Sequence, residues 1–83
     1  MAKWTVEQRK LDASKGIWTK NGTWEVEAQE PDEALKYVFV NYLDLTDEFD
    51  RFIRQASKEL FGLTLTVENK SWLVKPAGAG VPG

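Results

Sequence analysis

The chain has 83 residues and a formal net charge of −2, with 42% hydrophobic and 29% charged residues. This length and composition are typical of one small soluble domain, and they argue against a disordered chain. The lack of cysteine excludes disulfides and thiolate metal sites, and the lack of histidine removes the commonest general base and zinc ligand. No segment reads as a signal peptide or membrane span, so we expect a cytoplasmic protein that does not bind membranes.

The first predicted element is a strand over residues 3–11, in which apolar Trp4 and Val6 alternate with polar side chains. Residues 12–16 then form a turn-rich connection to the next element.

Asn21-Gly22 follows, and this pair is the preferred centre of a type I′ hairpin turn. A two-residue loop there would place Trp18 opposite Glu25. Because side chains alternate between faces, we expect one face to carry Ile17, Thr19, Trp24, Val26 and Ala28. The other face carries Trp18, Lys20, Thr23, Glu25 and Glu27. Trp24 is therefore expected in the core and Trp18 on an open face.

Two helices are predicted next. Residues 30–33 (Glu-Pro-Asp-Glu) start the first, because proline suits the first helical position and carboxylates suit the positive end of the helix dipole. Its apolar residues at helical spacing are Ala34, Leu35, Val38, Phe39, Tyr42 and Leu43. Thr46 is the expected N-cap of the second helix, which should stop at Gly62. The apolar stripe of that helix comprises Phe49, Phe52, Ile53, Ala56, Leu60 and Phe61.

Residues 63–67 alternate like a strand, and Asn69-Lys70 is the expected turn into a strand over residues 71–75. The core face of this second hairpin should carry Leu65, Val67, Trp72 and Val74. Residues 76–83 are expected to form a flexible tail rich in glycine, alanine and proline. The sequence thus predicts a single α+β domain over residues 1–75. Its antiparallel sheet has four or five strands, including two hairpins, with two helices packed on one face.

Charge is distributed unevenly along the chain. Residues 1–20 carry a net charge of +3, residues 25–50 carry −8, and residues 51–75 carry +3. The acidic middle predicts a surface that attracts a basic partner, although the same charge also favours solubility.

The densest acidic segment lies near the junction of the two predicted helices and contains Asp44, Asp47, Glu48 and Asp50. Clustered carboxylates are typical of calcium or magnesium sites, but this spacing is not that of an EF-hand loop, and the central glycine of that loop is missing. The alternative is a solvated helix start in which Asp47 pairs with Arg51, and Asp50 with Arg54, at i,i+4. We favour the alternative and expect neither a metal nor a cofactor.

No catalytic constellation is recognisable in the sequence. The serines have no histidine to activate them, and the glycines form no phosphate-binding motif. We therefore expect a non-enzymatic protein without catalytic residues.

Nucleic-acid binding is one alternative function. Arg51, Arg54 and Lys58 lie at i, i+3 and i+7 of the predicted second helix, where they could follow a phosphate backbone. Trp18 with Lys20 could stack a base on the open sheet face, although nearby glutamates would repel phosphates.

The favoured function is protein binding, as an accessory or inhibitory domain whose partner has a basic surface. Tryptophan is enriched among interface hot spots, and an exposed Trp18 bordered by acidic side chains fits that role. The proposed contacts are Trp18, Glu25, Glu27, Asp44, Asp47, Glu48 and Asp50. By analogy alone, small proteins of this make-up include accessory factors of viruses and mobile elements. A third alternative is a structural subunit that self-associates through an exposed strand edge.

Overall fold

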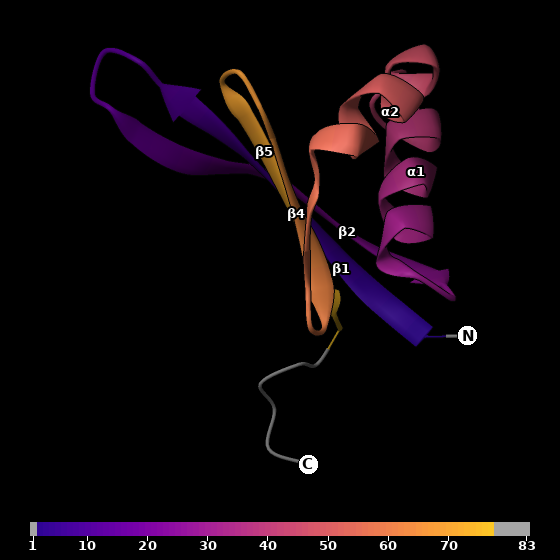
Figure 1. The fold of residues 1–83 in the computed structure, drawn as a ribbon. Helices are drawn as coiled ribbons and strands as arrows, with labels where there is room; N and C mark the ends of the chain where they lie inside the picture. The colour runs from indigo at the N-terminus through magenta and orange to yellow at the C-terminus, as the bar shows by residue number, and fades with distance from the viewer. Residues whose placement is uncertain (1, 78–83) are drawn as a thin grey trace.

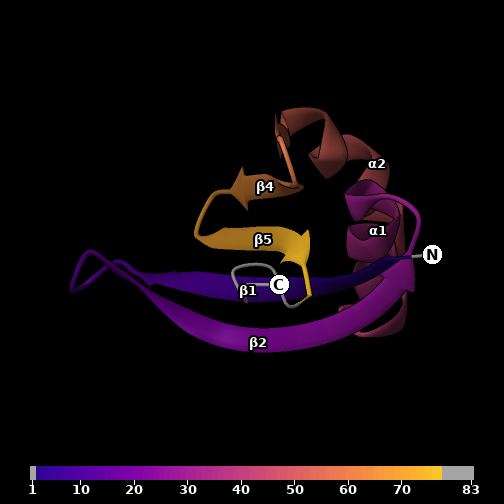
Figure 2. The ribbon, with the colours of Figure 1, turned by 90° about the horizontal axis from the view of Figure 1, so that it is seen from below.

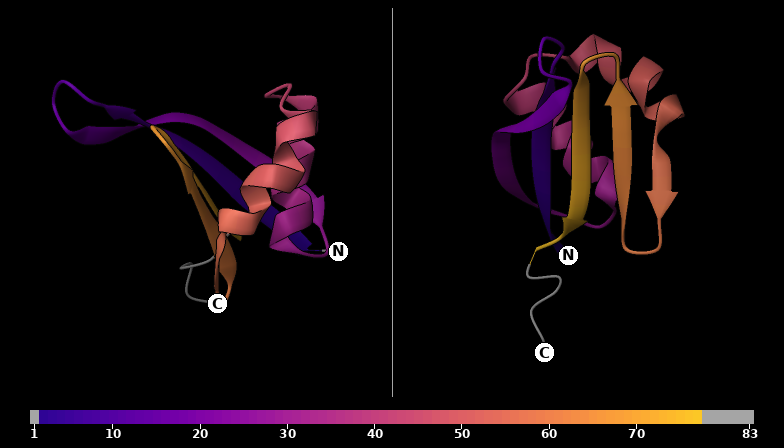
Figure 3. Two further views of the ribbon diagram at one scale, coloured as in Figure 1. Left: turned by 45° about the horizontal axis from the view of Figure 1, so that its top comes forward. Right: turned by 90° about the vertical axis from the view of Figure 1, so that its left-hand side faces the viewer.

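In the computed structural model, which describes residues 2–77, five antiparallel strands form one sheet in the order β2-β1-β5-β4-β3 (Figure 1). The elements in chain order are β1 (Ala2–Asp12), β2 (Ile17–Ala28), α1 (Pro31–Asn41), α2 (Thr46–Phe52), a 3₁₀ turn (Ile53–Gln55), β3 (Ser57–Glu59), β4 (Gly62–Val67) and β5 (Lys70–Pro76). The helices cover one face of the sheet, and the other, hereafter the open face, is uncovered (Figure 3). The predicted α+β architecture is confirmed. Residues 78–83 of the predicted tail lie outside the described residues.

β1 and β2 form a long hairpin whose turn lies at residues 13–16, which confirms the predicted connection over residues 12–16, whereas the further turn predicted at residues 21–22 does not form. Oδ1 of Asp12 accepts hydrogen bonds from the backbone N–H of Ser14 (3.1 Å) and from its hydroxyl (2.6 Å). Gly16 adopts φ 67°, the left-handed conformation that a loop of this kind requires. The predicted type I′ turn is therefore wrong, because β2 runs through Asn21 and Gly22 without a break.

Matching apolar residues along the whole β1–β2 register explain why residues 17–28 remain one strand. Trp4 pairs with Val26 and Val6 pairs with Trp24, so the core face is continuous across both strands. The Asn-Gly preference concerns two residues only, and the burial of a complete strand face outweighs it.

Asn21 and Gly22 form a β-bulge instead of a turn. Gln8 pairs with Gly22 while the next residue of β1 pairs with Lys20, which leaves Asn21 as the extra residue. A Cβ on Gly22 would lie 2.7 Å from the ring of Trp24, so glycine leaves room for the indole to lie across this position.

The bulge shifts the side-chain alternation of β2 by one residue. Trp24 consequently packs against the core, and Trp18 falls on the open face with Lys20, whose Nζ lies 3.9 Å from Oε1 of Glu7. The predicted faces of the two tryptophans are confirmed, but a bulge rather than a turn produces them.

α1 packs its predicted apolar face onto the sheet, and its start at Pro31 is confirmed. Its fully buried residues are Ala34, Leu35, Val38 and Phe39. The ring centroid of Phe39 lies 4.8 Å from that of Trp72 and 5.5 Å from that of Phe49. This aromatic cluster joins α1 to both the sheet and α2 at the centre of the core.

The second helix is much shorter than predicted. α2 ends at Phe52, the 3₁₀ turn adds three residues, and Ala56 is already extended with ψ 141°. Residues 57–59 then pair with β4, which satisfies backbone groups that a helix continuing to residue 62 would leave unpaired at this sheet edge. The N-cap position is Leu45 without a side-chain hydrogen bond, so the predicted N-cap at Thr46 is wrong by one residue.

Gly62 is a strand residue and not a helix stop. Its backbone approaches β5 so closely that a Cβ at this position would overlap the carbonyl oxygen of Val74. Leu60 and Phe61, predicted on the buried stripe of the helix, instead form the exposed β3–β4 turn.

The β4–β5 hairpin turns at residues 68–69 rather than at residues 69–70. Glu68 has φ 55°, and Val67 pairs with Lys70. The β4–β5 register differs by two residues from the predicted one. Because side chains alternate with a period of two, each side chain still lies on its predicted face of the sheet. The core face carries Leu63, Leu65, Trp72 and Val74, all buried.

We expect Gly62→Ala to lower the free energy of unfolding by about 1–3 kcal/mol, because β4 or β5 must move to admit the methyl group. Urea unfolding measures this change, and Thr64→Ala on the same strand is the control, with an expected effect below about 1 kcal/mol. A Gly62→Ala variant as stable as the wild type would contradict the close approach of the two strands.

Candidate functional site

Trp18 lies on a projecting two-stranded arm, which we define as residues 9–20. The pairing of β1 with β5 ends at Lys10, whereas β1 and β2 continue to pair as far as the turn. Figure 2 shows this arm extending beyond the other strands, at the end of the molecule away from the helices. Trp18 pairs with Leu11 and is 40% exposed.

The predicted pairing of Trp18 with Glu25 is therefore wrong. The two residues lie on the same strand, seven positions apart, which corresponds to about 23 Å along an extended chain. Glu25 and Glu27 are exposed on the open face, opposite Thr5 and Lys3 of β1.

The acidic residues of the predicted protein-binding site lie in the helical layer. They are Asp44, Asp47, Glu48 and Asp50. Asp44 occupies the α1–α2 loop with φ 55°, and the others belong to α2. The helical layer covers the face opposite Trp18 and Glu25, so the structure does not bring the two groups of predicted contacts onto one surface.

The acidic segment makes none of its predicted ion pairs. Within residues 2–77, neither Asp47 with Arg51 nor Asp50 with Arg54 forms a salt bridge, and no group of three potential ligands is placed to hold a metal ion. The guanidinium of Arg51 lies instead 5.1 Å from the ring centroid of Phe52. The segment therefore keeps its negative charge uncompensated by these neighbours.

The predicted basic stripe is also not formed. Arg51 lies in α2, Arg54 in the 3₁₀ turn and Lys58 in β3, where its Nζ lies 3.1 Å from Oδ2 of Asp32. The early end of α2 removes the helical spacing that would have aligned these three side chains.

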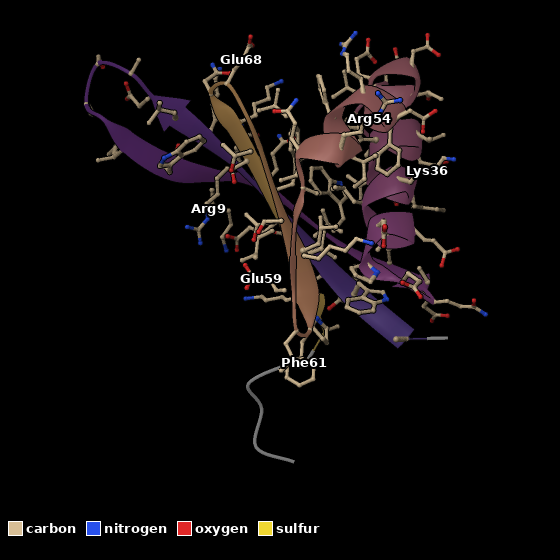
Figure 4. The ribbon with its side chains drawn as sticks, viewed as in Figure 1. Arg9, Lys36, Arg54, Glu59, Phe61 and Glu68 are labelled. Atoms are coloured by element: carbon tan, nitrogen blue, oxygen red, sulfur yellow. The ribbon has the colours of Figure 1, made fainter. Side chains whose placement is uncertain are left out.

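Basic side chains gather on the arm instead. Its charged residues are Arg9, Lys10, Asp12, Lys15 and Lys20. Four cations and one carboxylate give the arm a net charge of +3, which leaves −5 on the rest of the chain. Figure 4 shows Arg9 pointing away from the helical layer, and its Nε donates to Oε2 of Glu7 at 2.6 Å.

An exposed aromatic cluster, which the sequence reasoning missed, lies where α1 ends beside β2. Tyr42 stacks on Trp24 with ring centroids 5.9 Å apart and an interplanar angle of 28°, and Tyr37 lies 6.1 Å from Tyr42. Tyr37 and Tyr42 are 49% and 55% exposed, and the exposed Val40 lines a shallow surface pocket together with Tyr37. We call Trp24, Tyr37, Val40 and Tyr42 the tyrosine patch.

The exposed positions of the two tyrosines were not predicted from the sequence, for a different reason in each case. Helical periodicity assigned Tyr42 to the buried stripe. However, α1 ends at Asn41, and the side chain of Tyr42 turns outward onto Trp24. Tyr37 falls between the apolar positions of the helix, and this was the available signal that a large aromatic side chain lies on the exposed side.

The β3–β4 turn is a second exposed apolar feature. Leu60 and Phe61 are 87% and 70% exposed, and a shallow groove beside them is lined by Leu73 and Pro76. Figure 4 shows Phe61 at the end of the sheet remote from Glu68.

Comparison with known proteins finds no matching family, no similar curated protein and no similar solved structure. Among the described helices, none is long and apolar enough to cross a membrane.

The turn of the arm leads to a prediction about pH. The Ser14 hydroxyl, with the backbone N–H groups of Ser14 and Lys15, holds the pKa of Asp12 below its usual value of 3.8. Because the folded-state pKa is the lower one, this stabilisation of the turn is present above pH 3.8 and is lost as the pH falls through the folded-state pKa. We expect Ser14→Ala to raise the pKa of Asp12 toward its usual value, as measured by NMR titration of the carboxyl carbon.

Ser71→Ala serves as the control, because Ser71 bonds to Thr66 and not to Asp12. It should leave the titration of Asp12 unchanged. An Asp12 pKa that Ser14→Ala does not move would show that the hydroxyl is not its main perturbant.

Proposed function

We propose that the protein is a non-enzymatic binding domain, an accessory or inhibitory factor that docks onto a basic region of a cytoplasmic protein. The contacts are the tyrosine patch and the acidic segment that follows it. One observation carries this proposal, namely that Tyr42 stacks on Trp24 at the surface while remaining 55% exposed.

The tyrosine patch has the chemistry of an interface anchor. Tyrosine and tryptophan dominate interface hot spots because they offer a large contact area with few rotatable bonds. Trp24 is already held by the core and by its position over Gly22, and Tyr42 is held by the stack on Trp24. A partner would therefore meet ordered side chains, which lowers the entropic cost of binding.

The charge of the segment that follows the patch in the chain indicates the kind of partner. Asp44 follows Tyr42 by two residues, and Asp47 and Glu48 lie in the first turn of α2. Within the described residues, none of these three carboxylates makes a salt bridge. Lysine or arginine side chains of a partner could pair with them and also contact the faces of the tyrosine rings.

The open face remains a second surface for protein contacts. It carries the expected residues Trp18, Glu25 and Glu27, but Trp18 lies far along β2 from the two glutamates. The tyrosine patch is favoured because its aromatic rings touch one another and the acidic residues adjoin them in the chain. Self-association through an edge strand remains a further alternative, for which β2 offers the longer edge.

Capture experiments from the cells that express the protein test this proposal. We expect the wild type to retain a protein with a basic surface, identified by mass spectrometry. Tyr37→Ala/Tyr42→Ala should weaken its binding at least about tenfold, because truncation of a hot-spot side chain costs about 2 kcal/mol or more. Binding of the purified partner is then measured by calorimetry.

Trp18→Ala is the matched control, since it removes an exposed aromatic side chain from the opposite face. It should bind the partner as the wild type does. Asp47→Asn/Glu48→Gln should slow association and reduce its dependence on salt. If Trp18→Ala abolishes binding and the double tyrosine variant does not, the open face is the interface and the proposal is wrong.

A further inference from the structure

We infer that the arm is a separate nucleic-acid-binding element that inserts into the major groove of duplex DNA. This inference does not depend on the protein partner proposed above, because the arm and the tyrosine patch are different surfaces.

The shape of the arm suits a groove. It is a two-stranded antiparallel ribbon. The Leu11 N–H still donates to the carbonyl oxygen of Asn69 at 2.8 Å, and beyond Leu11 no third strand of residues 2–77 pairs with the ribbon. Figure 1 and the left panel of Figure 3 show it leaving the body of the sheet on the side away from the helices. The major groove of B-DNA is about 12 Å wide and admits a two-stranded ribbon. The deep, narrow major groove of A-form RNA does not admit one.

The positive charge at the base of the arm lacks a partner. Lys10 lies directly opposite Lys70 of β5, and like charges in such a pair destabilise a sheet. Neither lysine forms a salt bridge with any residue in the described part of the chain, and the same holds for Lys15 in the turn. DNA phosphates would relieve this repulsion and release bound counterions.

The open face of the arm also retains positive charge. Among the residues that the structure describes, Glu7 is the one carboxylate that forms salt bridges with Arg9 and Lys20. The Arg9 and Lys20 side chains are 50% and 63% exposed, so both can still reach a phosphate. The two faces of the ribbon therefore each present cations toward an enclosing groove.

Two apolar side chains lie between these cations. Ile17 and Trp18 are 50% and 40% exposed, and strand alternation places them on opposite faces of the ribbon. Apolar side chains in the major groove contact base edges and thymine methyl groups, which is a role that an exposed isoleucine and tryptophan can fill.

The acidic segment in the helical layer does not prevent the arm from binding DNA. Figures 1 and 2 show the arm and the helical layer, which carries the acidic segment, at opposite ends of the molecule. The longest dimension is 40 Å, whereas the Debye length at physiological salt is about 8 Å. Repulsion between the acidic segment and DNA held at the arm is therefore largely screened.

Fluorescence anisotropy tests the inference with a labelled DNA duplex of about 20 base pairs, the corresponding RNA duplex and single-stranded DNA. We expect the DNA duplex to bind at least about tenfold more tightly than the other two, and its affinity to fall as salt rises from about 50 to 200 mM. Lys10→Ala/Lys15→Ala should weaken duplex binding by about tenfold. It should also reduce the steepness of the logarithmic salt dependence by about 2, since each phosphate contact contributes about 0.9.

The matched control is Lys36→Ala/Arg54→Ala, which removes the same charge from the helical layer (Figure 4). It should change the affinity by less than about threefold, and circular dichroism verifies that both double variants are folded. Failure of the wild type to bind duplex DNA at low salt overturns the inference, as does an equal loss in the control variant. Equal affinity for RNA or single strands would exclude groove insertion. If polyglutamate carrying the same total charge displaces the DNA, an acidic protein is the ligand of the arm and the inference is wrong.

Discussion

A hydrogen-bond chain that begins in the core determines how the β1–β2 hairpin leaves the sheet. Trp72 is 1% exposed and donates from Nε1 to Oε1 of Gln8 at 2.8 Å, and Nε2 of Gln8 donates to Oδ1 of Asn21 at 3.0 Å. Because Gln8 is itself buried, its amide requires partners inside the protein. The bulge brings Asn21 within reach of that amide. It also shifts the alternation of β2, so that Trp18 and Trp24 face opposite sides.

Both candidate surfaces depend on this arrangement. Phe39 packs on Trp72 and so holds α1 over the same part of the sheet, which brings Tyr42 onto Trp24. The arm, in turn, begins at the bulge, and its residues Arg9 and Lys10 still pair with β5 before β1 and β2 continue alone. A single buried indole therefore couples the position of the tyrosine patch to the direction of the arm. The tyrosine patch and the arm are therefore supported by the same contacts in the core.

Features governed by local chemistry could be predicted from the sequence, and features governed by distant pairing could not. The start and buried face of α1 follow from Pro31 and from helical periodicity. The turn before β2 was predicted correctly at residues 12–16, but the extra turn predicted at Asn21-Gly22 does not form, because the long β1–β2 register keeps β2 continuous. The length of α2 was overestimated because residues 57–59 are recruited to the edge of β4, a contact that no helical pattern reveals. At the candidate site, the open-face position of Trp18 was predictable, but the stack of Tyr42 on Trp24 depends on tertiary packing.

Like charges that are neighbours in the sequence stay together in the structure only where their segment folds as one unit. The basic N-terminal flank contributes to both strands of a hairpin, so four of its five cations, all except Lys3, remain together on the arm. The acidic middle includes the helical segment, and much of its charge therefore collects in one layer. The basic residues after position 50 belong to four different elements, and the sheet disperses them. A run of like charges in the sequence therefore predicts a charged binding surface best when its segment folds as one unit. That relation favours the arm over the dispersed helix stripe as the place where this acidic protein can meet an anionic ligand.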